Sequence, residues 1–106
     1  MKPSIEPISG GYVNLAIQGK NCGVYFETAG QGQPLLCLHT AGSNSRQYRG
    51  VMNCKTITDH FQVICFDLPY HGKSSPPEGW EQYEYQLTSQ LYVDPILGVM
   101  AALDLL

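Results

Sequence analysis

Two short apolar runs constrain the fold of this chain more than any other part of its sequence. The first spans residues 35–38 (LLCL) and the second spans residues 61–66 (FQVICF). A short apolar run bounded by turn residues is typical of a strand buried on both faces, as in a parallel sheet. Between the runs lie about twenty residues that predict a helix, with Asn44 or Ser45 as its N-cap. Residues 35–66 are therefore predicted to form a βαβ unit with a right-handed crossover.

The remaining segments complete a predicted single domain. Proline and glycine punctuate residues 1–11, which we expect to be an irregular lead-in. Two β-rich runs around a glycine-bearing loop predict a β-hairpin over residues 12–34. Residues 67–86 contain too many prolines and glycines for a long regular element, and an apolar stripe predicts a helix over residues 87–106. The predicted fold class is α/β, with an N-terminal β-hairpin and a βαβ unit in a mixed, mostly parallel sheet that is incomplete.

The last helix and the composition both indicate that the sheet is incomplete. Pro95 either kinks this helix or lies in its first turn behind an Asp94 cap. The helix reaches Leu106 without a C-terminal glycine or a cationic last turn. Charged residues make up 14% of the chain, against roughly 25% in soluble domains. We therefore expect a truncated domain that contains more core than its own surface covers.

Composition also excludes several classes of partner. Six Lys and Arg residues against nine Asp and Glu residues give a net charge of -3, which argues against a nucleic-acid module. The longest uncharged apolar run, residues 95–103, is about half of a membrane span. Four cysteines without a Cys-x-x-Cys pair, and an N-terminus without an apolar signal core, predict a reduced cytoplasmic protein. Three scattered histidines indicate no metal site, and we expect no cofactor.

Chemistry is expected in the two loops that follow the apolar runs, because ligands of open α/β sheets bind beyond the carboxyl ends of the strands. The first loop spans residues 39–45 (HTAGSNS) and the second spans residues 67–74 (DLPYHGKS). Small residues in the first loop let backbone N–H groups approach a ligand, either a developing oxyanion or a phosphate. His39 is expected to hold this loop through hydrogen bonds to backbone groups. Asp67 is expected to cap N–H groups of the second loop and not to catalyse.

These loops resemble two motifs of the α/β-hydrolase fold family. Residues 36–43 (LCLHTAGS) are similar to the His-Gly-x-x-x-Ser segment after that family's third strand. Residues 67–74 are similar to the Asp-x-Pro-Gly-x-Gly-x-Ser loop after its fourth strand, and the hairpin end at residues 27–34 (ETAGQGQP) also matches. The similarity runs from about Tyr12 to Leu106. It covers the N-terminal part of the family's fold, up to the helix before the nucleophile elbow.

The resemblance implies a serine hydrolase that acts on a carboxylic ester, a thioester or a related acyl or C–C bond of a small molecule. It implies that the Ala41 N–H is an oxyanion-hole donor, and the expected substrate contacts around it are His39, Thr40, Gly42 and Ser43. Thr40 and Tyr70 depart from the pattern, since they stand where the family has glycine. Thr40 is expected to reshape the oxyanion loop without removing its backbone donors.

The family's nucleophile lies in a Gly-x-Ser-x-Gly elbow, and no such motif occurs in the 106 residues. Residues 72–76 (GKSSP) are a partial match around Ser74. The resemblance therefore implies that this chain supplies the oxyanion loop, lacks nucleophile, acid and base, and is inactive alone. Two other functions stay open. One is a small module that binds an anion or nucleotide with residues 39–45, and the other is an interaction protein that self-associates through the exposed edge of residues 35–38.

Overall fold

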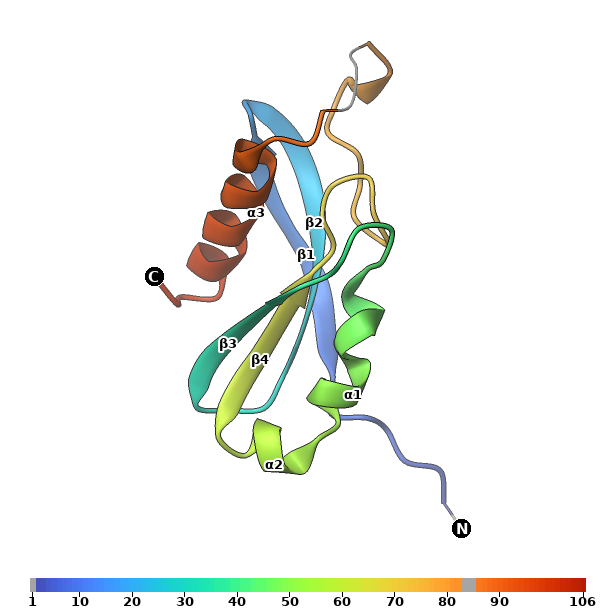
Figure 1. Cartoon of the computed structure of the whole chain (residues 1–106), viewed down its shortest axis with the longest axis vertical. Helices are drawn as coiled ribbons and strands as arrows, with labels where there is room; N and C mark the ends of the chain where they lie inside the picture. Colours follow the sequence, from blue (N-terminus) through green and yellow to red (C-terminus); the bar gives the residue numbers. More distant parts are fainter. Residues whose placement is uncertain (1, 83–85) are drawn as a thin grey trace.

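Within residues 2–82 and 86–106, which the computed structural model describes, four strands form one mixed sheet (Figure 1). In spatial order they are β1 (Ser9–Ile17), β2 (Lys20–Ala29), β4 (Phe61–Phe66) and β3 (Gln33–Leu38). β1 pairs antiparallel with β2, β2 pairs antiparallel with β4, and β4 pairs parallel with β3. The α/β class, with an N-terminal hairpin and a parallel strand pair joined by a crossover, is therefore confirmed. The predicted loop 67–86 includes residues 83–85, which lie outside the described residues.

The β1–β2 hairpin turns on the dipeptide Gln18–Gly19, whose φ angles are 52° and 78°. Positive φ at both positions is the signature of a type I′ turn, whose twist matches that of the paired strands. β1 begins at Ser9, within the predicted lead-in of residues 1–11, because β2 extends far enough to pair with Gly10. A Cβ at Gly10 would lie 2.4 Å from the Tyr25 hydroxyl. This glycine therefore makes room for the Tyr25 ring and does not interrupt the strand.

The crossover from β3 to β4 is broken into three single turns, where one helix was predicted. They are η1 (Ser45–Tyr48), α1 (Arg49–Met52) and α2 (Lys55–Thr58). Asn44 caps the first turn as predicted, since its Oδ1 accepts the Arg46 N–H at 2.9 Å. Cys54 is extended, with φ -88° and ψ 104°, which interrupts the helical path before α2. The turns cover one face of the sheet and bury Met52 against β4.

The last helix, α3 (Ser89–Ala102), packs against the hairpin on the opposite face of the sheet (Figure 1). Thr88 precedes it, and the Thr88 Oγ1 accepts a backbone N–H of the first turn at 3.3 Å. The helix is therefore shorter at both ends than the predicted range 87–106. A Cβ at Gly98 would lie 2.8 Å from the Leu15 side chain, so the helix and β1 are in close contact at this point.

Pro95 lies inside α3 and is buried. Because Thr88 provides the N-cap, the alternative of a helix that starts behind Asp94 is wrong. The Asp94 carboxylate instead accepts the Gln18 N–H at 2.9 Å, which ties the helix to the hairpin turn. Neither α3 nor any other helix among the described residues is long and apolar enough to cross a membrane.

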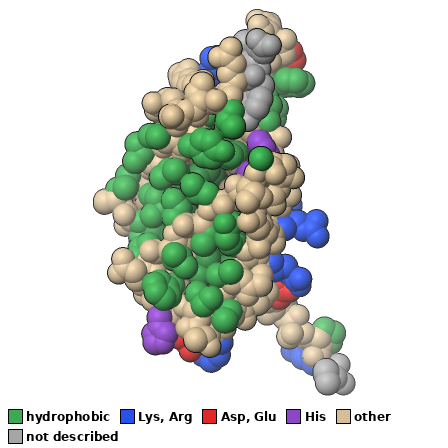
Figure 2. All heavy atoms as spheres, in the orientation of Figure 1, with side chains coloured by type: hydrophobic (Ala, Val, Ile, Leu, Met, Phe, Trp, Pro, Cys, Tyr) green, Lys and Arg blue, Asp and Glu red, His purple; other side chains and the backbone are tan. Residues whose placement is uncertain are grey.

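The two parallel strands differ in burial. In β4 the residues from Val63 to Phe66 are buried, because strands flank both edges and apolar clusters cover both faces. β3 lies at the edge of the sheet, and Leu38 at its end is 39% exposed. The prediction that both runs are buried on both faces is therefore right for β4 and wrong for β3. Figure 2 shows hydrophobic side chains gathered over β3 and α3, where Val93 and Leu97 are also exposed.

Candidate functional site

The loops after β3 and β4 leave the same edge of the sheet, because these strands are parallel and Leu38 pairs with Phe66. The His39 ring joins the two loops. Its Nε2 accepts the Leu68 N–H at 3.0 Å, and its Nδ1 donates to the Thr40 carbonyl at 2.9 Å. These partners assign the ring proton to Nδ1. His39 therefore holds backbone groups, as expected, which leaves its ring carbons for any contact with a substrate.

Asp67 lies at the end of β4 and is 1% exposed. Its Oδ1 accepts the Ser45 N–H at 2.6 Å, and its Oδ2 accepts the Lys73 N–H at 2.8 Å. The expectation that Asp67 caps loop N–H groups is thereby confirmed. Gly72 lies against the same carboxylate with φ 50°, and a Cβ there would lie 2.2 Å from Oδ2. Asp67 thus ties the start of η1 to the loop after β4, and only glycine fits at position 72.

Two hydrogen bonds hold the Ser74 hydroxyl inside the loop after β4. Its Oγ donates to the Asp67 carbonyl at 2.6 Å and accepts the Tyr25 N–H at 2.9 Å. Both bonds connect this loop to the central strands, and Ser74 is buried between them. Ser74, the serine of the partial match to a nucleophile motif, therefore has its hydroxyl engaged in two hydrogen bonds to backbone groups.

Residues 40–43 form a tight turn at the end of β3. The Ser43 N–H donates to the Thr40 carbonyl at 3.0 Å, and Gly42 has the positive φ, 74°, that the third residue of a type II turn requires. Ala41 and Gly42 are exposed. No acceptor from residues 2–82 or 86–106 pairs with either of their N–H groups. The turn therefore presents two consecutive backbone donors to solvent at the carboxyl edge of the sheet.

Gln47 was not among the predicted site residues. Its Oε1 accepts the Thr40 N–H at 2.9 Å and the Thr40 hydroxyl at 3.2 Å. On the same turn, the Tyr48 hydroxyl donates to the Leu38 carbonyl at 2.6 Å. The sequence carried no signal for these contacts, because the partners are 7 and 10 residues apart and a glutamine on a helical turn usually faces water.

Tyr70 has a left-handed backbone, with φ 70°. A non-glycine residue in this region costs roughly 1–2 kcal/mol, which explains why glycine suits this position. Beside it, His71 donates from Nδ1 to the Pro69 carbonyl at 2.9 Å, and its ring centroid lies 5.1 Å from that of His39. The loop after β4 therefore follows a course that glycine would adopt with less strain.

A cavity of about 240 Å³ lies between β2, η1 and the loop after β4. Its lining residues are Tyr25, Glu27, Asn44, Ser45, Arg46, Asp67, Gly72 and Lys73. Tyr25 Oη donates to Glu27 Oε2 at 2.8 Å, and burial together with this carboxylate raises the pKa of Tyr25 to about 12. Lys73 Nζ lies 4.9 Å from the centroid of the Tyr25 ring. Tyr25 therefore stays protonated at neutral pH. Its hydroxyl holds the Glu27 carboxylate, and its ring lies beside the Lys73 ammonium group.

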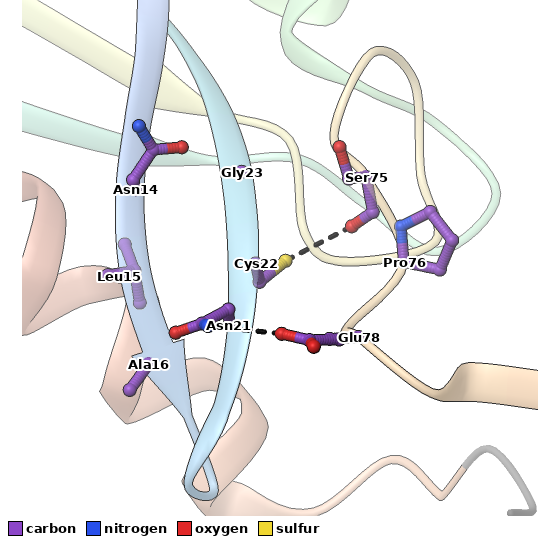
Figure 3. Close-up of a pocket in the computed structure, with 9 residues that line it drawn as sticks. All are labelled: Asn14, Leu15, Ala16, Asn21, Cys22, Gly23, Ser75, Pro76 and Glu78. Atoms are coloured by element: carbon purple, nitrogen blue, oxygen red, sulfur yellow. Dashed lines mark hydrogen bonds between the residues drawn. The ribbon is translucent and has the colours of Figure 1, made fainter. Parts of the chain in front are cut away.

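A second cavity, of about 650 Å³, lies between the hairpin and the segment that follows Ser74 (Figure 3). Among its lining residues, Asn21 Nδ2 donates to Glu78 Oε2 at 3.0 Å, and the Cys22 thiol donates to the Ser75 carbonyl at 3.1 Å. Burial raises the pKa of the Cys22 thiol, which disfavours the nucleophilic thiolate. No group of three or more metal-ligating side chains occurs among the described residues. The carboxyl edge of β3 and β4 is therefore the candidate site.

Comparison with known sequences identifies the fold family of this chain. A model of the alpha/beta hydrolase fold family matches residues 33–104, which include both strands and both loops. A pimeloyl-[acyl-carrier protein] methyl ester esterase from Vibrio cholerae is 35% identical over 52 residues, which make up 49% of this chain and 20% of that protein. The matched residues thus cover about a fifth of the length of this curated relative.

Solved structures show the same fold at low sequence identity. An epoxide hydrolase from Vigna radiata superposes with a TM-score of 0.72 at 20% identity, over 96% of this chain and 30% of that one. A thermophilic esterase from Thermogutta terrifontis also gives 0.72, at 21% identity, over 92% and 33%. A haloalkane dehalogenase from Agrobacterium tumefaciens gives 0.63, at 24% identity, over 91% and 30%. These proteins catalyse different hydrolyses, so the likeness establishes the fold alone.

Proposed function

Because this chain belongs to the alpha/beta hydrolase fold family, we propose that the loop after β3 supplies the oxyanion hole of a serine hydrolase. The substrate class is a small-molecule carboxylic ester, thioester or related acyl compound. The methyl ester esterase from Vibrio cholerae supports an ester as the first compound to test.

The turn at residues 40–43 is the observation that carries this proposal. When a nucleophile attacks a carbonyl carbon, negative charge develops on the carbonyl oxygen, and fixed N–H donors stabilise that charge. The exposed N–H of Ala41 is suited to this task, because no acceptor in the described part of the chain competes for it. We assign the surrounding substrate contacts to Thr40, Gly42, Ser43 and the ring edge of His39.

The donor assignment can be tested by NMR with methylphosphonate, a stable tetrahedral oxyanion. Two charge-assisted hydrogen bonds of about 2 kcal/mol each correspond to a Kd on the order of 1 mM. We expect the largest amide shifts at Ala41 and Gly42. Ala41→Pro is the matched control, because proline suits the second position of a type II turn and has no N–H. Gly42 shifts that are unchanged in Ala41→Pro would contradict the assignment to Ala41.

The nucleophile is assigned to no residue of this chain. The sequence contains no Gly-x-Ser-x-Gly motif, and both hydrogen bonds of the buried Ser74 hydroxyl are made to backbone groups. We therefore expect the purified protein to release p-nitrophenol from p-nitrophenyl acetate without a burst, and the Ser74→Ala variant to behave alike. A burst in the wild type that Ser74→Ala abolishes would show that this chain carries its own nucleophile.

A second candidate function is self-association through β3, for which its position at the sheet edge is the supporting observation. Residues Gln33–Leu38 contain no charged side chain, and charges are the usual means of blocking an edge strand. Size-exclusion chromatography at increasing protein concentration tests this function. A growing dimer fraction would support edge pairing, and a monomer at every concentration would exclude it.

The cytoplasm is the compartment that we propose for this protein. All four cysteines are free thiols, and each is buried or half-buried. Unpaired cysteines are typical of a reducing compartment. Fractionation of cells that express the protein, with mass spectrometry of its thiol state, tests this placement.

A further inference from the structure

We propose that Gln47 is a positioning residue for the loop after β3. Its side-chain oxygen fixes Thr40 so that the loop presents the Ala41 N–H, and not the Thr40 N–H, to an oxyanion. This inference rests on the proposed function, because it concerns the donor that the oxyanion would meet.

One oxygen of Gln47 makes both contacts. Oε1 accepts the Thr40 N–H at 2.9 Å and the Thr40 hydroxyl at 3.2 Å. An amide carbonyl oxygen has two lone pairs, so it can accept both hydrogen bonds at once. The Thr40 N–H is therefore engaged within the protein, and the next N–H along the chain, that of Ala41, is the first one without an acceptor in the described residues.

Gln47 is itself held in place from both parallel strands. Its own N–H donates to the Asn44 carbonyl at 3.1 Å within η1. At the start of η1, the Ser45 N–H is bound to the Asp67 carboxylate at 2.6 Å, and at its end the Tyr48 hydroxyl is bound to the Leu38 carbonyl at 2.6 Å. Hydrogen bonds to the ends of β4 and β3 thus fix the position of Gln47. Because Gln47 binds Thr40, they also fix the orientation of the turn at residues 40–43.

This arrangement gives a reason for threonine at position 40, where the hydrolase pattern has glycine. A glycine would keep the N–H contact to Gln47 and lose the hydroxyl contact. Thr40 has both, and its Cβ restricts the backbone to fewer conformations than glycine allows. Thr40 and Gln47 therefore act as a pair, and the loss of either side chain is expected to loosen the same turn.

The test repeats the methylphosphonate titration with Gln47→Ala. Loss of the clamp is expected to weaken the response of the Ala41 amide about fivefold, the effect of one lost hydrogen bond. It is also expected to speed hydrogen exchange of the Thr40 amide on the order of tenfold, as its protecting acceptor is removed. Thr40→Val removes the hydroxyl and keeps the shape of the side chain, so its effect should lie between wild type and Gln47→Ala.

Two control variants separate positioning from general damage. Gln47→Glu retains an oxygen that can accept both Thr40 protons, and it should restore the slow exchange of the Thr40 amide. Gln31→Ala changes an exposed glutamine remote from the turn in sequence, and it should leave the titration unchanged. An Ala41 response of equal affinity in wild type, Gln47→Ala and Thr40→Val overturns the positioning role alone. No Ala41 response in the wild type overturns the proposed function, and the positioning role falls with it.

Discussion

The loops that leave the two parallel strands differ in what becomes of their polar groups. After β4, Asp67 and Ser74 are buried, and their side-chain oxygens are bonded to backbone groups. After β3, the N–H groups of Ala41 and Gly42 face solvent without an acceptor among residues 2–82 and 86–106. The side-chain oxygens of Asp67 and Ser74 are thus used within the protein, while the loop after β3 keeps two consecutive N–H donors available for a ligand.

The position of each strand in the sheet explains the difference. β4 is central, so its loop starts inside the protein, where an unpaired polar group costs about 1–3 kcal/mol. β3 is at the edge, and the turn residues Ala41 and Gly42 that follow the buried His39 are in contact with water, which satisfies free N–H groups at little cost. The loop after β4 uses its buried side-chain oxygens to bind backbone groups, so it serves as a scaffold. The exposed turn after β3 is held by this scaffold and can bind a ligand. Asp67 connects the two, because it binds Ser45 of the crossover and Lys73 of its own loop.

Among variants of the two loops, removal of the Asp67 carboxylate is expected to cause the largest loss of stability. Asp67→Ala removes two hydrogen bonds to a charged group, the buried one from the Ser45 N–H and the part-buried one from the Lys73 N–H. We therefore expect a loss of about 3–5 kcal/mol in the free energy of unfolding. Urea denaturation followed by circular dichroism measures this loss. Asp67→Asn keeps one acceptor oxygen and should lose about half as much.

Asp59→Ala is the control for this substitution. Asp59 pairs with Lys55 in an exposed ion pair on α2, and such pairs contribute about 0–1 kcal/mol. A loss for Asp67→Ala no greater than that for Asp59→Ala would mean that the loop after β4 is not a scaffold.

Alanine at one glycine of each loop gives the next largest effect. In Gly72→Ala the new Cβ lies 2.2 Å from the Asp67 carboxylate, and the backbone is left-handed, with φ 50°. In Gly42→Ala the backbone is also left-handed, with φ 74°, but no atom lies within 4 Å of the new Cβ. We expect Gly42→Ala to lower the free energy of unfolding by about 1–2 kcal/mol, which is the strain of the backbone alone. Gly72→Ala should lower it by about 3 kcal/mol or more, because the new Cβ also displaces the buried, hydrogen-bonded Asp67 carboxylate.

Thermal or urea unfolding of both variants measures the difference, with Gly50→Ala in α1 as the reference. Gly50 has open space around its Cβ position and no positive φ, so alanine there should stabilise the helix by about 0.5–1 kcal/mol. Equal losses for Gly72→Ala and Gly42→Ala would remove the distinction between a packed and an open loop.

The last comparison concerns the strands themselves, through an effect that is absent at neutral pH and develops only at alkaline pH. Burial, with a contribution from the neighbouring Cys37, raises the pKa of the Cys65 thiol on β4 from 9.0 to about 12. The folded state therefore binds this proton more tightly than the unfolded state. The resulting stability is complete below pH 9 and is lost as the pH rises toward about 12. Unfolding free energies measured across this window should fall less steeply in Cys65→Ala than in the wild type.

Cys37→Ala on β3 is the matched control. Cys37 pairs with Cys65 in the register of the two strands, but it is only half-buried. Cys37→Ala should change the slope of the unfolding free energy against pH, between pH 9 and about 12, less than Cys65→Ala does. Tyr25, whose pKa is also raised to about 12, contributes the same slope to every variant. A larger change for Cys37→Ala would contradict the burial difference between β3 and β4.

Local patterns predicted much of the fold, and they failed where a distant partner decided the outcome. The two apolar runs, the Asn44 cap and the capping role of Asp67 follow from turn and cap chemistry within a few residues. The predicted start of the hairpin at residue 12 was wrong, because pairing with β2 extends β1 through Gly10. The sequence allows α3 to start either near residue 87 or at Pro95, and the Thr88 cap fixes the earlier start.

The α/β class, the parallel strand pair and the two loops at its carboxyl edge could all be predicted from the sequence. These features depend on apolar runs and turn residues that are contiguous in the chain. Three other features depend on how the chain folds: β3 is the exposed edge, Ser74 is buried, and Gln47 holds Thr40. The reason is that a backbone N–H is free or engaged according to what the fold brings within about 3 Å of it. That partner is contributed by another segment, and no pattern around Ala41 specifies it.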